Sequence, residues 1–185
     1  MKFTVTKIAE VLLIEPDVYR DKRGQFMEAF NAKKYEAILG KCDWVQDNFS
    51  QSLKGVVRGL HLQWPNPQGK LVSVSYGSVF DVAVDVRKGS PTFGKWVGEV
   101  LDGESCRQLW IPPGFAHGFQ ALTDGAVLNY KCSGNFWSPK TEQTVFYDDP
   151  AIGISWPIDV SLSIERDLNA PDLKDCVNLP RMDQF

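Results

Sequence analysis

The chain contains only two histidines, His61 and His117, and the surroundings of each suggest chemistry. Histidine titrates closest to neutral pH and is the commonest general acid or base in enzymes. His61 lies in "KGVVRGLHLQ" (54–63), where Arg58 and Gly59 interrupt a run of valine and leucine that is otherwise typical of a β-strand. Burial alone gives no reason for these three residues, so we consider His61 a candidate proton-transfer group.

The second histidine ends the P-x-G-x-x-H pattern of "IPPGFAHGF", formed by Pro112, Gly114 and His117. This pattern is typical of a rigid turn that feeds a strand and directs the imidazole inward, and it is a signature of the cupin jelly roll. A histidine that merely caps a turn would give the same pattern, and the motif alone does not decide between the two.

A metal site is the usual use of histidine in a cupin, but the sequence does not favour one. A metal-binding cupin needs an H-x-H pair, whereas this chain reads His61-Leu62-Gln63. Two histidines cannot supply three imidazoles, and a site of two imidazoles and a carboxylate would require both rings to converge. We therefore expect a pocket without a metal, in which the imidazoles are free to move protons.

Strict strand alternation separates Arg58 from His61. Side chains alternate between the two faces of a strand, so Gly59, His61 and Gln63 share one face and Arg58 lies on the other. Gly59 is the position where a β-bulge could reset the alternation. The sequence predicts an irregularity there if Arg58 and His61 contact one ligand, and a regular strand would count against a substrate role for Arg58.

Most of residues 45–147 reads as short strands. The segment 71–86 contains two β-rich runs separated by Gly77, and 95–114 contains two more around the turn signal Asp102-Gly103. The segment 126–132 follows Asp124-Gly125, which is a further hairpin signal. Closely spaced strands with few helices predict an all-β sandwich or barrel, formed by one domain spanning 1–185.

Two helices are predicted outside this block. Asn31 is a suitable N-cap and Gly40 a suitable stop for a helix over 31–40. A short C-terminal helix is expected over 170–177, with Pro171 in its first turn.

Composition limits the classes of partner. The formal net charge is −3, and no basic stripe suggests a nucleic acid or an anionic membrane as partner. No apolar run approaches the length of a membrane span or of a secretory signal, so we expect a cytoplasmic protein. The four cysteines show no C-x-x-C spacing and are expected to be reduced thiols.

Several segments taken together closely resemble the dTDP-4-dehydrorhamnose 3,5-epimerase family. They include "VQDNFSQS" (45–52), "VVRGLHLQ" (56–63), "RQLWIPPGFAHGFQAL" (107–122), "LNYKC" (128–132) and "DDPAIGISWP" (148–157), and the similarity runs from about residue 21 to 173. The resemblance implies a cupin-type jelly roll with a few short peripheral helices, a homodimer, and an isomerase that needs neither cofactor nor metal. The implied substrate is dTDP-4-dehydro-6-deoxy-D-glucose, and the implied product is dTDP-4-dehydro-L-rhamnose.

The chemistry of that reaction suits the residues already noted. C3 and C5 of the sugar flank the C4 ketone, so loss of either proton gives an enolate. An epimerase then needs a base on one face, an acid on the other and a positive group at the ketone oxygen. The resemblance implies His61 as base, Tyr130 as acid, Asp167 as the carboxylate that orients His61, and Lys70 near the ketone oxygen.

Other positions match residues that contact substrate in the family. They are Arg23, Glu28, Gln46, Asn48, Arg58, His117, Glu142 and Arg166. Arginine suits the diphosphate, because its planar fork donates two hydrogen bonds to phosphate oxygens.

The sequence departs from the family pattern at the pocket wall. Leu62 follows the histidine where an aromatic residue is frequent, Arg166 replaces a frequent lysine, Phe136 replaces a tyrosine near the sugar, and the loop 132–139 is one residue longer. A relative that inverts only C3 or only C5 is therefore the main alternative. A metal-dependent cupin oxygenase or isomerase and a non-catalytic sugar-binding cupin are the alternatives from other classes.

Overall fold

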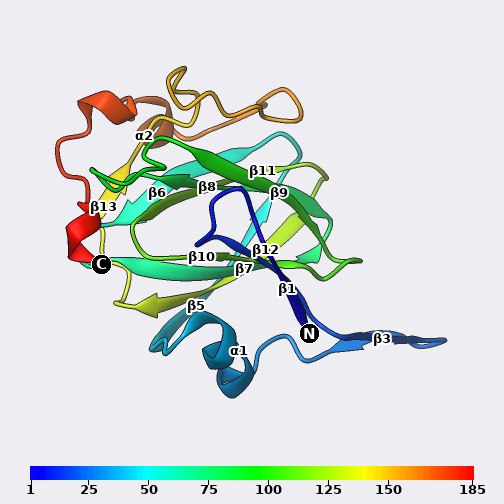
Figure 1. Cartoon of the computed structure of the whole chain (residues 1–185). Coiled ribbons are helices and arrows are strands. Elements are labelled where there is room, and N and C mark those ends of the chain that lie inside the picture. Colours follow the sequence, from blue (N-terminus) through cyan, green and yellow to red (C-terminus); the bar gives the residue numbers. More distant parts are fainter.

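The computed structural model describes all residues from Met1 to Phe185, and its regular secondary structure is almost entirely antiparallel β-strand (Figure 1). The strands are β1 (Lys2–Val5), β2 (Leu12–Glu15), β3 (Val18–Asp21), β4 (Gly24–Met27), β5 (Trp44–Ser52), β6 (Val57–Gln63), β7 (Gln68–Tyr76), β8 (Ser78–Asp85), β9 (Trp96–Asp102), β10 (Gln108–Ile111), β11 (Phe115–Ala121), β12 (Ala126–Gly134) and β13 (Glu142–Thr144). The helices are α1 (Ala32–Leu39) and α2 (Glu165–Leu168), with single 3-10 turns at Leu173–Asp175 and Met182–Gln184. This is the all-β jelly roll with short peripheral helices that the sequence predicts.

Two sheets make up the body of the molecule. One contains six strands in the order β1-β2-β10-β7-β12-β5, and the other contains five in the order β13-β6-β11-β8-β9. The turn at Gly77, which has a φ of 69°, carries the chain from β7 in the first sheet to β8 in the second. The predicted break at Gly77 is confirmed.

The hairpin predicted at Asp124-Gly125 is wrong. A turn does occur there, but β11 pairs with β6 and β8, whereas β12 pairs with β5 and β7. The strands around Asp102-Gly103 likewise join different sheets, because β9 pairs with β8 and β10 pairs with β2 and β7. An Asp-Gly pair fixes a reversal of the chain, but the burial pattern of the next strand decides which sheet it joins.

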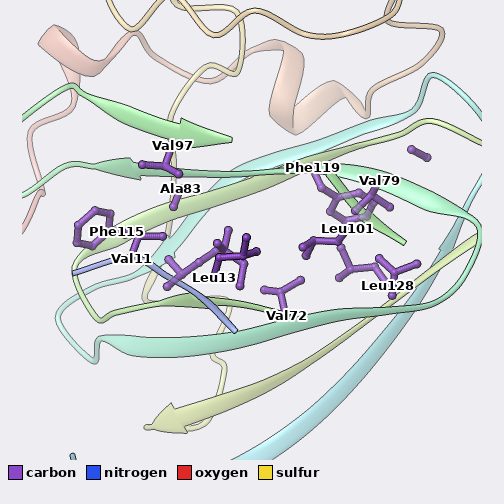
Figure 2. Close-up of a cluster of buried hydrophobic side chains, with 14 of the residues drawn as sticks. Val11, Leu13, Val72, Val79, Ala83, Val97, Leu101, Phe115, Phe119 and Leu128 are labelled. Atoms are coloured by element: carbon purple, nitrogen blue, oxygen red, sulfur yellow. The ribbon is translucent and has the colours of Figure 1, made fainter. Parts of the chain in front are cut away.

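The main hydrophobic core lies between the two sheets (Figure 2). Val72 and Leu128 face it from the six-stranded sheet, while Val79, Leu101 and Phe119 face it from the other. A second cluster covers the outer face of the five-stranded sheet, where the chain after β13 packs on β6 and β8. Because both faces of the five-stranded sheet are covered, β8 is buried along most of its length.

The helix expected over 31–40 is confirmed as α1. The Asn31 side chain accepts a hydrogen bond from the Lys34 backbone N–H, and Gly40 ends the helix at a φ of 76°. The C-terminal helix expected over 170–177 is only a 3-10 turn, and the sequence did not indicate α2. None of the helices is long or apolar enough to cross a membrane.

The β3–β4 hairpin projects away from the two sheets (Figure 1). Its side chains are largely exposed, and Tyr19 and Phe26 stand in solvent at 66% and 70% exposure. Aromatic side chains on a projecting hairpin are typical of a surface that packs against a partner.

Candidate active site

A cavity of about 280 Å³ opens between the two sheets beside the apolar core, and Phe119 borders both. It is lined by Gln46, Asn48 and Ser50 of β5, Arg58, His61, Leu62 and Gln63 of β6, Gln68 and Lys70 of β7, His117 and Phe119 of β11, Tyr130 and Cys132 of β12, Trp137, and Glu142 of β13. Along β12, alternation places Leu128 in the core and Tyr130 and Cys132 in the cavity. The inward faces of the strands thus carry apolar side chains in the core and polar side chains in the cavity.

The irregularity predicted at Gly59 is confirmed. His61 is paired with His117 and Arg58 with Phe119, so β6 takes three steps where β11 takes two. Gly59 has a φ of 129°, and a Cβ there would lie 2.5 Å from the Gly118 Cα, so only glycine fits. The bulge brings Arg58 and His61 to the same cavity despite their spacing.

His61 is held by the carboxylate of Asp167, which is 1% exposed. The His61 Nε2 lies 2.8 Å from Asp167 Oδ1, and the Gly59 backbone N–H released by the bulge donates to Oδ2 at 3.2 Å. Burial acts to raise the pKa of Asp167, but hydrogen bonds from His61, Gly59 and Arg166 outweigh it and hold that pKa below the ordinary value. Asp167 is therefore ionised at neutral pH and favours a proton on Nε2, which leaves the Nδ1 lone pair as the basic position.

Arg166 joins this pair to the neighbouring strand β13. Its Nε donates to Asp167 Oδ1 at 3.0 Å, its Nη1 bonds Glu142, and its Nη2 lies 2.7 Å from His61 Nε2. A ring nitrogen either donates or accepts at one time, so Arg166 and Asp167 compete for Nε2. The Asp167 carboxylate can only accept from a protonated Nε2, whereas the Arg166 guanidinium can only donate to an unprotonated one. The charge-assisted bond to the buried carboxylate favours the protonated Nε2.

His117 forms a second pair of the same kind with Asp81. The His117 Nε2 lies 2.7 Å from Asp81 Oδ1, and the two side chains are 7% and 0% exposed. Burial lowers the pKa of His117, although Asp81 opposes the shift, so this imidazole is neutral at pH 7. The Oδ2 of Asp81 has no hydrogen-bond partner.

Tyr130 and Lys70 complete the polar end of the cavity. Burial raises the pKa of Tyr130 to about 12, so its phenol keeps its proton at physiological pH. Burial lowers the pKa of Lys70, with Cys132, Glu142 and Asp81 acting in the opposite direction. The Lys70 Nζ lies 3.4 Å from the His61 carbonyl oxygen and 5.9 Å from the centre of the Tyr130 ring.

The structure brings together most of the site residues that the sequence suggests. His61, Tyr130, Lys70, Gln46, Asn48, Arg58, His117 and Glu142 line the cavity. Asp167 and Arg166 line an adjoining hollow of about 270 Å³ that shares Arg58 and His61 with it.

Arg23 and Glu28 lie elsewhere, on and just after the β3–β4 hairpin. Arg23 is paired with Asp21 and its side chain is 85% exposed, while Glu28 is paired with Lys34. Neither lines the cavity within this chain.

Four residues of the site were not identified from the sequence. Asp81 is the only acid in the run "SVFDVAV" of β8, and a carboxylate at an inward position of an apolar strand was the available signal. Trp137 lies in a loop, and Gln63 and Gln68 are common strand-end residues, so none of the three gives a local pattern. Their role depends on contacts between β6, β7 and the loop after β12.

The four cysteines are free thiols, as expected, and Cys132 lines the cavity. No three His, Cys, Asp or Glu side chains are grouped so that they could hold a metal ion. The expectation of a site without a metal or cofactor stays a prediction.

The jelly roll encloses a cavity that holds an imidazole, a phenol and an ammonium group. These groups are suited to proton transfer on a bound small molecule. The chain matches the sequence pattern of the dTDP-4-dehydrorhamnose 3,5-epimerase family over residues 5–175. It is 51% identical over 177 residues to a dTDP-4-dehydrorhamnose 3,5-epimerase of Shigella flexneri, covering 95% of this chain and 97% of that protein. The chain belongs to the dTDP-4-dehydrorhamnose 3,5-epimerase family.

Solved structures agree with this assignment. A dTDP-6-deoxy-D-glucose-3,5-epimerase of Legionella pneumophila, in complex with dTDP-4-keto-L-rhamnose, is 51% identical, with a TM-score of 0.92 and 97% of each chain covered. A 3'-monoepimerase of Streptomyces bikiniensis in complex with dTDP-quinovose is 35% identical, with a TM-score of 0.90 over 96% of this chain and 92% of that one. The fold therefore accommodates both double and single epimerisation.

Proposed function

We propose that this chain is a carbohydrate epimerase that converts dTDP-4-dehydro-6-deoxy-D-glucose into dTDP-4-dehydro-L-rhamnose by inverting C3 and C5. The observation that carries the proposal is that His61, backed by Asp167, and Tyr130 line the same cavity. The high identity to relatives named for this reaction supports the choice of substrate.

In the proposed reaction, the His61 Nδ1 removes the proton from a carbon next to the C4 ketone. The electron pair of the broken C–H bond moves into the enolate, whose charge lies mainly on the ketone oxygen, and the Lys70 ammonium stabilises that oxygen. Tyr130 then donates its phenolic proton to the opposite face of the carbon, and the ketone reforms. The phenolate recovers its proton and His61 releases one, so the enzyme returns to its starting state.

Asp167 and His117 have supporting parts in this proposal. Asp167 keeps the proton on Nε2 and stabilises the imidazolium that forms during the reaction. His117 stays neutral because it is buried, and it can hydrogen-bond to the sugar without repelling the Lys70 ammonium. Only protons move in the reaction, so its chemistry needs no electron acceptor.

Proton NMR of the product formed in deuterium oxide tests the function. Deuterium at both C3 and C5 is the expected result, because each carbon loses its proton to the enzyme and regains one that has exchanged with solvent. Absence of turnover with the dTDP-sugar would contradict the proposal. Binding of the dTDP-sugar without exchange would instead favour a sugar-binding cupin.

A single epimerase is the second candidate. Two departures from the family pattern favour it, because Leu62 lines the cavity and Arg166 lines the adjoining hollow. The expectation that Phe136 forms part of the pocket wall is wrong, since its side chain is 70% exposed and does not line the cavity. A 3'-monoepimerase shares the fold at 35% identity. Deuterium at only one of the two carbons would identify this activity.

We also propose a homodimer, in which the β3–β4 hairpin of each chain reaches the cavity of the other. The hairpin projects from the body, exposes Tyr19 and Phe26, and carries Arg23, with Glu28 just beyond it. Sedimentation equilibrium should give twice the chain mass, and Arg23→Ala should raise KM without changing that mass. A monomer with full activity would contradict this arrangement. The cytoplasmic location stays a prediction.

A further inference from the structure

The segment 135–141, which joins β12 to β13 and is called the strap below, supplies Trp137 to the wall of the cavity. Three glutamines from three different strands hold it. Gln46 Oε1 accepts a hydrogen bond from the Trp137 backbone N–H at 3.0 Å, and Gln68 Nε2 donates to the Asn135 carbonyl at 2.5 Å. Gln63 Oε1 accepts from the Ser138 backbone N–H at 3.1 Å and from the Thr141 hydroxyl at 2.6 Å.

We call these three glutamines and Thr141 the clamp, and Gln63 is its central member. Its side chain lines the cavity and is 5% exposed, and its orientation is fixed because a backbone N–H can only donate. The Nε2 of Gln63 has no partner. An unpaired buried N–H is destabilising relative to an apolar side chain of the same size, so stability of the core alone does not account for a glutamine here.

The strap also contacts the catalytic side of the cavity. The Trp137 Nε1 donates to Glu142 Oε1 at 3.1 Å, and the other oxygen of Glu142 bonds Arg166, which contacts Asp167. Trp137 is 48% exposed, so it lies at the mouth, whereas His61 and Tyr130 lie deeper. A sugar that reaches the two deeper groups leaves its nucleotide at the mouth, beside Trp137.

We propose that Gln63 and Thr141 are positioning residues, which hold the strap so that Trp137 forms a fixed wall against the nucleotide end of the substrate. This inference rests on the proposed function. Fixing the wall before binding lowers the entropy that the strap would otherwise lose when substrate binds. Loss of the clamp should therefore weaken substrate binding and leave the proton-transfer step largely unchanged.

Thr141→Val is the sharpest test, because Thr141 does not line the cavity and the substitution keeps its size while removing the hydroxyl. We expect KM for the dTDP-sugar and the dissociation constant of dTDP, measured by calorimetry, to rise roughly three- to tenfold, as for the loss of one hydrogen bond. The kcat should stay within about twofold, and Thr141→Ser should restore KM. Thr123→Val is the matched control, because its hydroxyl accepts from the Ser78 N–H away from this cavity, and it should change neither constant.

A double-mutant cycle with Trp137→Ala tests whether the clamp acts through this residue. Thr141→Val should have no further effect on KM in the Trp137→Ala background. Unchanged KM and dTDP affinity in Thr141→Val, or an undiminished effect without Trp137, would overturn the proposal. Wild-type protein that binds dTDP but does not convert the dTDP-sugar would contradict the proposed function, while the calorimetric comparison would still test the clamp.

Discussion

Two histidine–aspartate pairs lie on neighbouring strands, with His61 of β6 directly opposite His117 of β11. In each pair the ring Nε2 meets a carboxylate oxygen at 2.7 to 2.8 Å. The His61 side chain is 21% exposed, and its carboxylate receives additional bonds from Gly59 and Arg166. His117 is 7% exposed, and Asp81 has no other partner.

This comparison indicates that a histidine–aspartate pair is suited to act as a base where its surroundings support a charged imidazolium. The network around Asp167 keeps that carboxylate ionised and therefore able to stabilise imidazolium on His61. Burial around His117 disfavours the charged ring. We therefore assign proton abstraction to the first pair and a structural and hydrogen-bonding role to the second.

Substitution of each histidine by asparagine should give the largest difference in kcat and Tm between the two pairs. We expect His61→Asn to lower kcat by roughly 10³-fold, within the usual contribution of a general base, with little change in Tm. His117→Asn should lower kcat less and Tm more, because buried Asp81 has no other partner, whereas buried Asp167 keeps its bonds from Gly59 and Arg166. Steady-state kinetics and thermal unfolding of both variants provide the measurement, and equal losses of kcat would break the distinction.

Substitution of Asp167 should likewise lower kcat more than substitution of Asp81. Asp167→Asn should lower kcat by roughly 10²-fold or more, because the amide no longer holds the reactive tautomer or stabilises imidazolium. Asp81→Asn should lower kcat by less than tenfold. A larger loss of kcat in the Asp81 variant would reverse the assignment of the pairs.

Acid unfolding gives a second measure of Asp167. Its pKa in the folded chain lies below the ordinary value of 3.8, so its contribution to stability is fully present above that value. The contribution is lost as pH falls through the folded-state pKa. Asp167→Asn should remove this part of the pH dependence, which urea unfolding at pH 7 and pH 3 measures against wild type.

Tyr130→Phe should leave proton abstraction in place but impair completed inversion, by roughly ten- to a hundredfold.

Tyr130 should also affect unfolding at alkaline pH. Its phenol holds its proton in the folded chain up to a pKa of about 12, whereas an unfolded tyrosine ionises near 10. Above pH 10 this residue therefore favours unfolding. The phenylalanine variant should therefore resist alkaline unfolding better than wild type. Normal inversion in this variant would exclude Tyr130 as the acid.

Arg58→Ala should have the smallest kinetic effect of this series, a rise in KM of roughly tenfold, because in the proposed reaction Arg58 binds substrate and takes no part in proton transfer. Its guanidinium is held by Ser52 Oγ at 3.0 Å and by the Gln51 carbonyl at 3.2 Å. Arg181→Ala is a suitable control, since that side chain pairs only with Asp183 at the surface. A fall in kcat without a rise in KM would show that Arg58 positions the reacting carbon instead.

Local sequence signals predicted the features that depend on local chemistry. Asn31 and Gly40 define α1 because a cap and a stop act within one turn, and Gly59 marks the bulge because only glycine adopts that backbone conformation. Residues that act across strands were harder to find. Asp81 is unusual as a carboxylate in an apolar strand, but its partner His117 lies on another strand and cannot be read from that position. Helix α2 is four residues long, too short to show a helical period.

The resemblance to the family supplied what local patterns could not. Tyr130, Lys70 and Asp167 are ordinary strand, surface and charge-cluster residues when considered singly. Tyr130 and Lys70 share a cavity with His61 only when β6, β7 and β12 pack together, and Asp167 reaches it through His61 from the adjoining hollow. The Asp124-Gly125 signal predicted a reversal correctly but the wrong strand pairing, because pairing is decided by the whole sandwich.

The most direct test of His61 as the base is exchange of the C3 and C5 protons of dTDP-4-dehydro-6-deoxy-D-glucose for deuterium. Proton NMR in deuterium oxide follows this exchange with wild-type and His61→Ala protein at equal concentration. We predict that both protons exchange with wild type and that neither exchanges measurably with the variant. Exchange at the wild-type rate in folded His61→Ala protein would contradict the account.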